Sequence, residues 1–533
     1  MAENSFYSQQ RSFFLSQVLI ILFVTLYTVV WSYISLLRYY SLNAYVFDLG
    51  IEMQRMWMVF HTNWTVFSFI KYFLYSGFSM LISPIAFLNS YPFLLVLQTL
   101  VLAVPAYYIF LIARQMGIKN SDSLLISSAY LIYFPLAGMN FFDFHFQSFF
   151  ILFFLIGYYE FIKGRYKLSF LLFFLSGLIR FPLIIFPLLF SLIELIDLFW
   201  KQRKTKNYGT TKLDFLLVLI TLSSILLIFG FFFQGNSASS GNLHLISDNS
   251  ITLNLYPKIF TLFIILIPFF FINLISIKKS ILLLPYVFLL FTSNFLGYQY
   301  PIVNNNSHYF ALVIPFVFLG SIDTLSRINR VTLKKKINSH IKGLCNLINR
   351  CLNSFVIKRL IYFVVIAVVV TAVFLEPYGP LNKETNNNYN WPSEYNFNSS
   401  TFNTVIAIEN LIPRNTSMTN ILIQDDLPMV LPKPAESIYT PPLSPILTQF
   451  SPEINLSDVS NNTFPILIGE DSYVNATFDY AIAYTYNYVY YAGDPSMQTI
   501  VHLMMNSGKY GLLANESGIL LLERNYHGNV LIV

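Results

Sequence analysis

The chain has 533 residues, of which 55% are hydrophobic and only 11% charged, and its formal net charge is +6. Soluble globular proteins carry about 25% charged residues, so the composition excludes an ordinary soluble domain and indicates a polytopic α-helical membrane protein. The basic residues fall mainly in short loops and form no patch of the kind that binds nucleic acid, which excludes a nucleic-acid partner.

Apolar segments long enough to cross a bilayer, about 17–25 residues, recur along the chain. The first follows a polar N-terminus without a small-residue cleavage site, so we expect it to remain as a signal anchor. In chain order we predict about eleven transmembrane helices, near 13–37, 92–113, 123–140, 147–162, 168–180, 183–200, 213–233, 259–277, 281–298, 309–325 and 360–376.

Basic residues indicate the orientation of these helices in the cell membrane. They cluster at 163–167, at 201–206 and in the long stretch 327–359, which fall between alternate pairs of helices. The positive-inside rule places these loops and the N-terminus in the cytoplasm, and an odd number of crossings places the C-terminus outside. Cys345 and Cys351 lie in the most basic loop, where a reducing compartment favours free thiols.

Asn-x-Ser/Thr acceptors give a second topological signal, because all of them fall on the side opposite the basic loops. We therefore predict N-linked glycans on the outer surface. The acceptor positions are Asn63, Asn305, Asn398, Asn415, Asn455, Asn461, Asn475 and Asn515.

Residues 377–533 differ in composition from the first 376, being rich in Asn, Pro, Ser and Thr. Short β-like runs such as FDYAIAYT and GILLLER alternate with a helical pattern at 496–507, and the turn signal NESG precedes the last strand. We predict a transmembrane helical domain over 1–376 and a small extracytoplasmic α/β domain over 377–533.

Polar residues interrupt the apolar pattern on the side that should face outward. The stretch FFDFHFQSFF sets Asp143 and His145 among phenylalanines, where burial without partners would cost several kcal/mol. In DLGIEMQRMW, a helix would place Asp48 and Glu52 on one face with Arg55 close by.

Two further polar groups fall on the same side. Arg180 lies at the tip of a helical hairpin in GLIRFP, and His308 stands beside Tyr309 at the start of a descending helix. Acids, imidazoles and guanidinium groups above an apolar bundle suit transfer from a lipid phosphate. Cations hold the phosphate, and a carboxylate serves as general base for an acceptor hydroxyl.

Each of these residues also has a non-catalytic interpretation. The two histidines and the acids of DLGIE could be solvated interfacial groups, and Arg180 could reach a lipid headgroup. A zinc site, a G-x-S-x-G nucleophile elbow and a phosphate-binding loop do not fit the sequence.

The words FDLGIEMQRMW, PFLLVLQTLVLAVPAYYIFLIARQMG and AYLIYFPLAGMNFFDFH resemble the polytopic membrane proteins of domain of unknown function 2079. The likeness runs from about residue 40 to 320 and more loosely through the tail. That family is in turn similar to the GT-C membrane glycosyltransferases, so the resemblance implies a GT-C-like bundle that uses a polyprenyl-phosphate-linked sugar. This chain has fewer polar residues than the family pattern at two places. In IRFP, Arg180 is the one charged residue of the expected polar cluster, and in GFS, Gly77 stands where we expect a histidine.

By position, the resemblance gives Asp48 the role of the first-loop acid, and gives Asp143 and His145 a place in the second external loop. We expect Asp48 to act as base or as ligand of a divalent metal, with Glu52 assisting. Asp143 and His145 would orient the acceptor or the metal. The substrate-binding candidates are Arg180, His308, Tyr309 and Arg55.

The leading hypothesis is a glycosyltransferase that moves a sugar from a polyprenyl-phosphate carrier to an acceptor at the outer face of the membrane. The alternative is a non-catalytic glycosylated scaffold that contacts a cell-surface protein through residues 377–533. The dense acceptor sites and the depleted polar cluster favour this alternative. A transporter fits less well, because midplane charges and paired interrupted helices are not evident.

Overall fold

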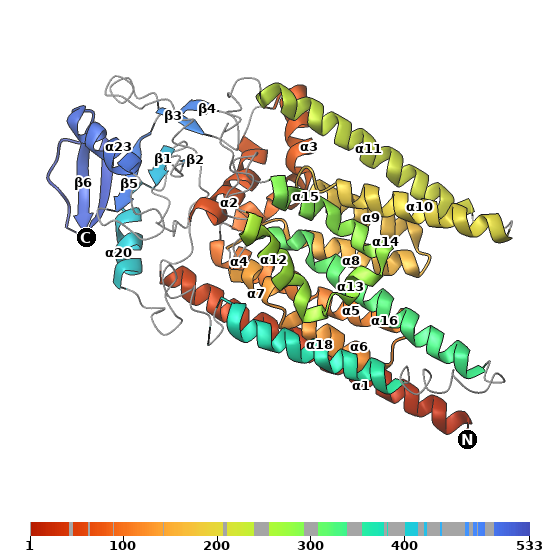
Figure 1. Ribbon diagram of the computed structural model, residues 1–533. Coiled ribbons are helices and arrows are strands. Elements are labelled where there is room, and N and C mark those ends of the chain that lie inside the picture. The colour runs from red at the N-terminus through yellow and green to blue at the C-terminus, as the bar shows by residue number, and fades with distance from the viewer. Residues whose placement is uncertain are drawn as a thin grey trace.

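A computed structural model describes most of the chain, and Figure 1 shows a bundle of helices followed by a smaller domain that contains strands. Everything below concerns the described residues. The residues outside the description are 1, 42–45, 62–63, 89, 142, 206–209, 239–254, 293–307, 338–353, 378–380, 382–399, 414–419, 424–436, 440–463, 468–472, 477, 485–494 and 533.

The bundle consists of α-helices of very different lengths, linked in four places by 3₁₀ turns. The turns are η1 Ser83–Leu88, η2 Ile267–Phe269, η3 Ile281–Leu283 and η4 His308–Leu312. The helices are α1 Ala2–Tyr40, α2 Val46–His61, α3 Val66–Ile82, α4 Tyr91–Ala103, α5 Pro105–Gln115, α6 Asn120–Leu131, α7 Phe134–Phe141, α8 Ser148–Ile162, α9 Tyr166–Leu178, α10 Ile185–Thr205, α11 Thr210–Ala238, α12 Leu255–Leu266, α13 Ile272–Ile275, α14 Ile277–Ser280, α15 Leu284–Thr292, α16 Ile314–Ile337 and α18 Ser354–Leu375.

Six segments of the described residues are long and apolar enough to cross a membrane: 10–40, 66–86, 91–115, 120–141, 211–232 and 308–328. Shorter apolar helices lie at 148–162, 166–178, 255–269 and 359–375. The chain is thus a multi-pass helical protein with the composition of membrane spans, while the count of eleven stays a prediction.

The structure differs from the predicted spans in two places. Segment 66–86, which we expected to be part of an external loop, forms α3 and the first part of η1. The start of α3 is fixed by a capping box in which Thr65 and Ser68 bond each other's backbone. Figure 1 shows α3 running crosswise to α11, against which it packs. In the described parts of the predicted spans 259–277 and 281–298, which are residues 259–277 and 281–292, the chain forms a series of short helical pieces, because it turns through left-handed conformations after Pro268.

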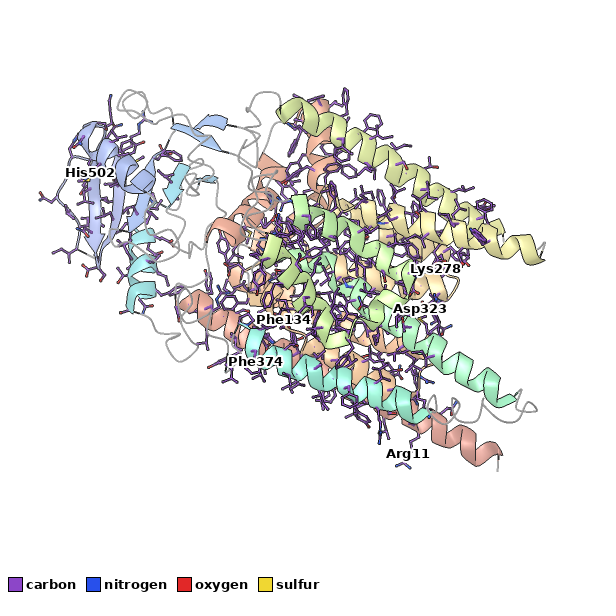
Figure 2. All side chains as sticks on the ribbon, viewed as in Figure 1. Arg11, Phe134, Lys278, Asp323, Phe374 and His502 are labelled. Atoms are coloured by element: carbon purple, nitrogen blue, oxygen red, sulfur yellow. The ribbon has the colours of Figure 1, made fainter. Side chains whose placement is uncertain are left out.

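Aromatic side chains fill the core of the bundle. The rings of Phe186 and Phe316 stack with centroids 5.1 Å apart, and Phe154 meets Phe316 edge-on at 4.9 Å. Figure 2 labels Phe134, which is fully buried, and Phe374, which is half exposed at the edge of α18. Large apolar side chains therefore occur on both the inside and the outside, as expected where the surrounding solvent is hydrocarbon.

Ion pairs gather near the end of the bundle that carries the N-terminus and the basic ends of α10 and α16 (Figures 1 and 2). Lys279 is buried, 3.5 Å from Glu194 and over the ring of Tyr158 at 4.5 Å. Lys212 is 3.2 Å from the same glutamate. Further pairs join Lys278 to Asp197 and Arg327 to Asp323. The pairs of Lys278 and Lys279 tie the short helix α14 to α10, and the pair of Lys212 ties α11 to α10.

The C-terminal part of the chain contains both helices and strands. Its main sheet has the order β2-β1-β5-β7-β6, with β1 parallel to β2 and β5, and β7 antiparallel to β5 and β6. Its elements are α20 Ser400–Glu409, β1 Asn420–Ile423, β2 Ser437–Tyr439, β3 Phe464–Leu467, β4 Tyr473–Ala476, β5 Tyr480–Tyr484, α23 Pro495–Asn506, β6 Tyr510–Glu516 and β7 Ile519–Arg524.

The C-terminal domain packs against the bundle at the C-terminal end of α1. The ring of Phe402 in α20 packs edge-on against Tyr39 at 5.8 Å and Tyr40 at 5.1 Å. The same end of α1 carries Arg38, so this junction lies next to the polar groups described below.

Candidate functional site

Asp143 is held by a residue that we did not single out from the sequence. Arg38, in the last turn of α1, lies 3.5 Å from the Asp143 carboxylate, and both side chains are almost fully buried. Arg38 also donates to the carbonyl of Phe141, and its guanidinium lies 4.0 Å from the centre of that ring. Asp143 therefore has a fixed ionic partner. The signal that could have identified Arg38 is a cation at the outer end of a span, where the positive-inside rule disfavours one.

Gln98 on α4 holds the same turn from the other side. Its amide nitrogen donates to the carbonyls of Asp143 and Met139, and its oxygen accepts from the backbone N–H of His145 at 2.7 Å and from Ser148 Oγ at 3.0 Å. Asp143 has a φ of 32°, in the left-handed region that aspartate tolerates better than most residues. A buried glutamine inside an apolar span was the available signal for this contact.

His145 meets His308, although 162 residues separate them in the chain. Their rings stack at 4.0 Å with an interplanar angle of 11°, and both side chains are buried. Tyr309 lies beside His308, with ring centres 4.2 Å apart. The structure thus brings three of the predicted site residues together at the start of η4.

Glu52 and Arg55 form an ion pair on α2. Their side chains are 2.8 Å apart, Glu52 is 3% exposed, and the second carboxylate oxygen of Glu52 has no hydrogen-bond partner among the described residues. The backbone carbonyl of Arg55 accepts from Tyr72 of α3 at 2.9 Å, which fixes α2 against α3. The i, i+3 spacing read from the sequence therefore produces a contact.

Arg55 and Arg180 share one aromatic ring. The guanidinium carbons lie 5.8 Å and 5.7 Å from the centre of Tyr75, and Arg180 donates to the Tyr75 hydroxyl at 3.0 Å. Arg180 and His145 are also the electrostatic neighbours of His308. The cations predicted from separate loops therefore belong to one group, in which Tyr75 is a member that sequence reasoning missed.

A break in α3 sets the position of Arg180. Ser76 has non-helical dihedral angles, and its hydroxyl donates to the carbonyl of Ile179 at 3.1 Å. The carbonyl of Tyr75 accepts from the N–H of Phe181 at 2.8 Å. At Gly77, an added Cβ would lie 3.1 Å from the Phe73 ring, so the glycine allows this ring to lie close to the backbone of α3.

The remaining predicted positions are only partly described. Asp48 lies in α2, but its side chain is outside the described residues. Among the described residues there is no group of three or more His, Cys, Asp or Glu side chains arranged to hold a metal. Asn515 is exposed on β6. Asn475 lies in β4, and its side chain is outside the described residues. The other acceptors, Asn63, Asn305, Asn398, Asn415, Asn455 and Asn461, and the two cysteines also fall outside it.

A comparison with protein families gives one result that covers nearly the whole chain. The model of a family described as predicted membrane proteins, domain of unknown function 2079, matches residues 38–521. The match begins at Arg38, includes all the polar groups above and ends in β7. No curated protein matches the chain. The chain therefore belongs to the DUF2079 family of predicted membrane proteins.

Proposed function

We propose that this protein is a GT-C-like glycosyltransferase, which moves a sugar from a polyprenyl-phosphate carrier to an acceptor at the outer face of the membrane. The observation that carries the proposal is the group formed by Arg55, Tyr75 and Arg180, with the stacked histidines beside it. The resemblance to GT-C enzymes noted from the sequence supports the same reaction class.

The charges of this group favour an anion. Two guanidinium groups, those of Arg55 and Arg180, lie near one ring, and Glu52 pairs with Arg55. Guanidinium groups bind phosphate through paired N–H donors, and such bonds strengthen where water is excluded. Arg55 and Arg180 would therefore hold the phosphate of the donor.

The carboxylates of α2 are the proposed bases. Asp48 would be the base or a metal ligand, and Glu52 would assist it through the carboxylate oxygen that Arg55 does not bind. The acceptor hydroxyl would give its proton to a carboxylate while its oxygen attacks the anomeric carbon. The bond from that carbon to the phosphate oxygen breaks, its electron pair stays on the phosphate, and the configuration inverts.

Asp143 fits a positioning role in this scheme. Its carboxylate is paired with Arg38, and its backbone is bonded to Gln98. The pair would hold the turn so that His145 stays against His308. His308, with Tyr309 beside it, would then contact the phosphate or the sugar.

The test is a transfer assay with the purified protein in lipid nanodiscs and a radiolabelled polyprenyl-phosphate sugar. Arg180→Gln should raise the KM for the donor at least tenfold, and Glu52→Gln should lower kcat by about 10²-fold or more, as loss of a general base does. Lys167→Gln, an exposed change at the start of α9, is the control and should leave both constants unchanged. Wild-type rates in both site variants would contradict the proposal.

A scaffold function is the second candidate, and one observation favours it. The C-terminal domain has a hydrophobic cluster of its own, which includes Leu422, Ala481, Met504 and Leu522. This cluster supports a domain that binds a partner, while other buried residues of the sheet, such as Ile482 and Leu521, belong to the cluster of the bundle. Stable recovery of a cell-surface protein with the full-length chain, lost when the exposed face of β6 is altered but not in Arg180→Gln, would favour this candidate.

A further inference from the structure

The segment from α12 to α15 is interrupted near the end of the bundle where Lys278 and Lys279 of α14 form ion pairs. After η2, Phe270 and Phe271 adopt φ values of 48° and 56°, and the chain continues through short pieces to α15. Irregular backbone at membrane depth is tolerated where protein covers it or where it lines a cavity.

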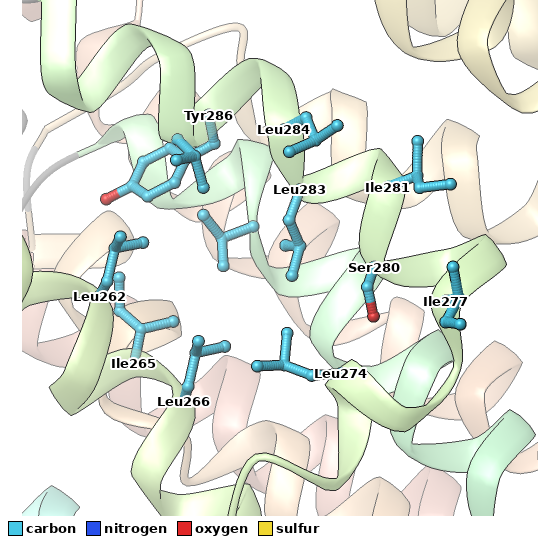
Figure 3. Close-up of a pocket in the computed structure, with 12 residues that line it drawn as sticks. Leu262, Ile265, Leu266, Leu274, Ile277, Ser280, Ile281, Leu283, Leu284 and Tyr286 are labelled. Atoms are coloured by element: carbon cyan, nitrogen blue, oxygen red, sulfur yellow. The ribbon is translucent and has the colours of Figure 1, made fainter.

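A cavity of about 370 Å³ lies beside this break (Figure 3). Its volume falls in the range of small-molecule sites, roughly 300–1,000 Å³. Ser280 Oγ, on its wall, donates to the carbonyls of Asn273 and Ser276, and the Tyr286 side chain is fully enclosed. The other lining residues are apolar and include Leu262, Ile265, Leu266, Leu274, Leu283 and Val313.

The cavity is open on the side that faces out of the bundle. Three of its lining residues have exposed side chains: Leu274 at 42%, Ile277 at 70% and Leu284 at 56%. On a membrane protein, exposed apolar side chains of the helical bundle face lipid. The cavity is thus continuous with bilayer hydrocarbon.

Such a cavity is unfavourable both when it is empty and when it holds water. An empty cavity loses the dispersion contacts of its walls. A water molecule needs two to four polar partners, whereas the Ser280 hydroxyl is already bonded to backbone carbonyls and the buried Tyr286 hydroxyl, which has no hydrogen-bond partner among the described residues, offers a single one. A hydrocarbon chain satisfies the walls and can enter from the side.

We infer that this cavity binds the hydrocarbon chain of a bulk bilayer phospholipid, which packs against the broken segment between α12 and α15. The apolar walls offer little that would select a rare lipid. The occupant should therefore be the lipid at the highest concentration in the bilayer, by mass action. None of the residues of the proposed phosphate group lines this cavity, and the inference does not rest on any transferase activity.

The experiment compares thermal unfolding of delipidated protein in detergent with and without added phosphatidylcholine. The wild type should gain about 3–5 °C from the phospholipid. Leu266→Trp places a larger side chain into the cavity from α12, so the variant should gain less than a third of that shift. Phe263→Trp, one turn earlier on the same helix and 46% exposed to lipid, is the matched control and should respond as the wild type does. Val287→Phe, which enters the cavity from α15, replaces the first variant if Leu266→Trp does not fold.

A photoreactive phosphatidylcholine with its diazirine on the acyl chain gives a direct readout in nanodiscs. Labelling should map to the segment from α12 to α15 and fall at least tenfold in the cavity-filling variant. Equal stabilisation and labelling of the variant and the wild type would overturn the site. Displacement of the probe by trace polyprenyl phosphate would overturn the assignment to bulk phospholipid.

Discussion

Arg38 lies at the C-terminal end of α1, where a cation is favoured by the helix dipole. Its charge is balanced by Asp143, by the carbonyl of Phe141 and by the face of the Phe141 ring. In a buried environment, loss of one partner leaves the other charge uncompensated, which is the costly case. The stability of the turn at 141–148 should therefore depend on both members of the pair.

Arg38→Met should destabilise the protein by about 3–5 kcal/mol, because Asp143 is then buried without its cation. The double variant Arg38→Met with Asp143→Leu should recover most of that loss, since two apolar groups replace the pair. Denaturant unfolding of both single variants and the double variant measures this cycle. Additive losses in the double variant would show that the two side chains are not coupled.

At this scale the sequence was informative about neighbours along the chain and uninformative about distant ones. The contact between Glu52 and Arg55 follows from helical spacing. The contacts of Asp143 with Arg38 and Gln98 join residues that are 105 and 45 positions apart, and periodicity does not encode them. His145 and His308 could be assigned to one membrane side, whereas their stacking required the fold.

At the scale of elements, local turn and cap signals predicted structure well in the C-terminal domain. The residues NESG form the turn between β6 and β7, where Ser517 and Gly518 have positive φ. The predicted helix at 496–507 corresponds to α23, whose ends each differ from the prediction by one residue. In the bundle, hydropathy did not identify the helix α3, and it did not reveal that the chain is interrupted after α12. Apolar content is similar whether a helix is continuous or interrupted.

Tyr510 on β6 gives a pH-dependent prediction for this domain. Its hydroxyl donates to the carbonyl of Phe478 at 2.7 Å, and burial raises its pKa above the ordinary value of about 10. The folded state therefore favours the protonated tyrosine. Its contribution to stability is present below about pH 10 and is lost as the pH rises further.

Tyr510→Phe should cost about 1 kcal/mol at pH 7 and should weaken the loss of stability above about pH 10. Pulse proteolysis of the C-terminal domain in the full-length protein, from pH 7 to 11, measures both effects. Tyr526→Phe, which removes a surface hydroxyl bonded to the carbonyl of Asn529, is the control. An unchanged alkaline profile in Tyr510→Phe would mean that another group controls it.

At the scale of the whole molecule, the basic ends of the helices and the C-terminal domain lie at opposite ends (Figure 1). The charge pattern predicts the orientation of the helices, and the composition change near residue 377 predicts a second domain; both stay predictions. The number of crossings needs the path of the segments outside the description as well. The outward orientation of the C-terminal domain is therefore best tested directly.

In a Cys345→Ser, Cys351→Ser background, Asn515→Cys should react with a membrane-impermeant maleimide on intact cells. Lys167→Cys should react only after the membrane is permeabilised, because it lies at the basic end. Both positions have exposed side chains, so access to each depends on the membrane alone. If Lys167→Cys were labelled on intact cells while Asn515→Cys was not, the orientation of the chain in the membrane would be the opposite of the one we predict.

We propose that polar groups from α2, α3, the 141–148 turn, the α9–α10 hairpin and η4 form one site for a lipid phosphate. The most direct measurement is equilibrium binding of sugar-free polyprenyl phosphate to the protein in phosphatidylcholine nanodiscs. We expect saturable binding that weakens at least tenfold in Arg55→Gln and in Arg180→Gln and is unchanged in Lys167→Gln. Equal binding by all four proteins, or none by the wild type, would contradict it.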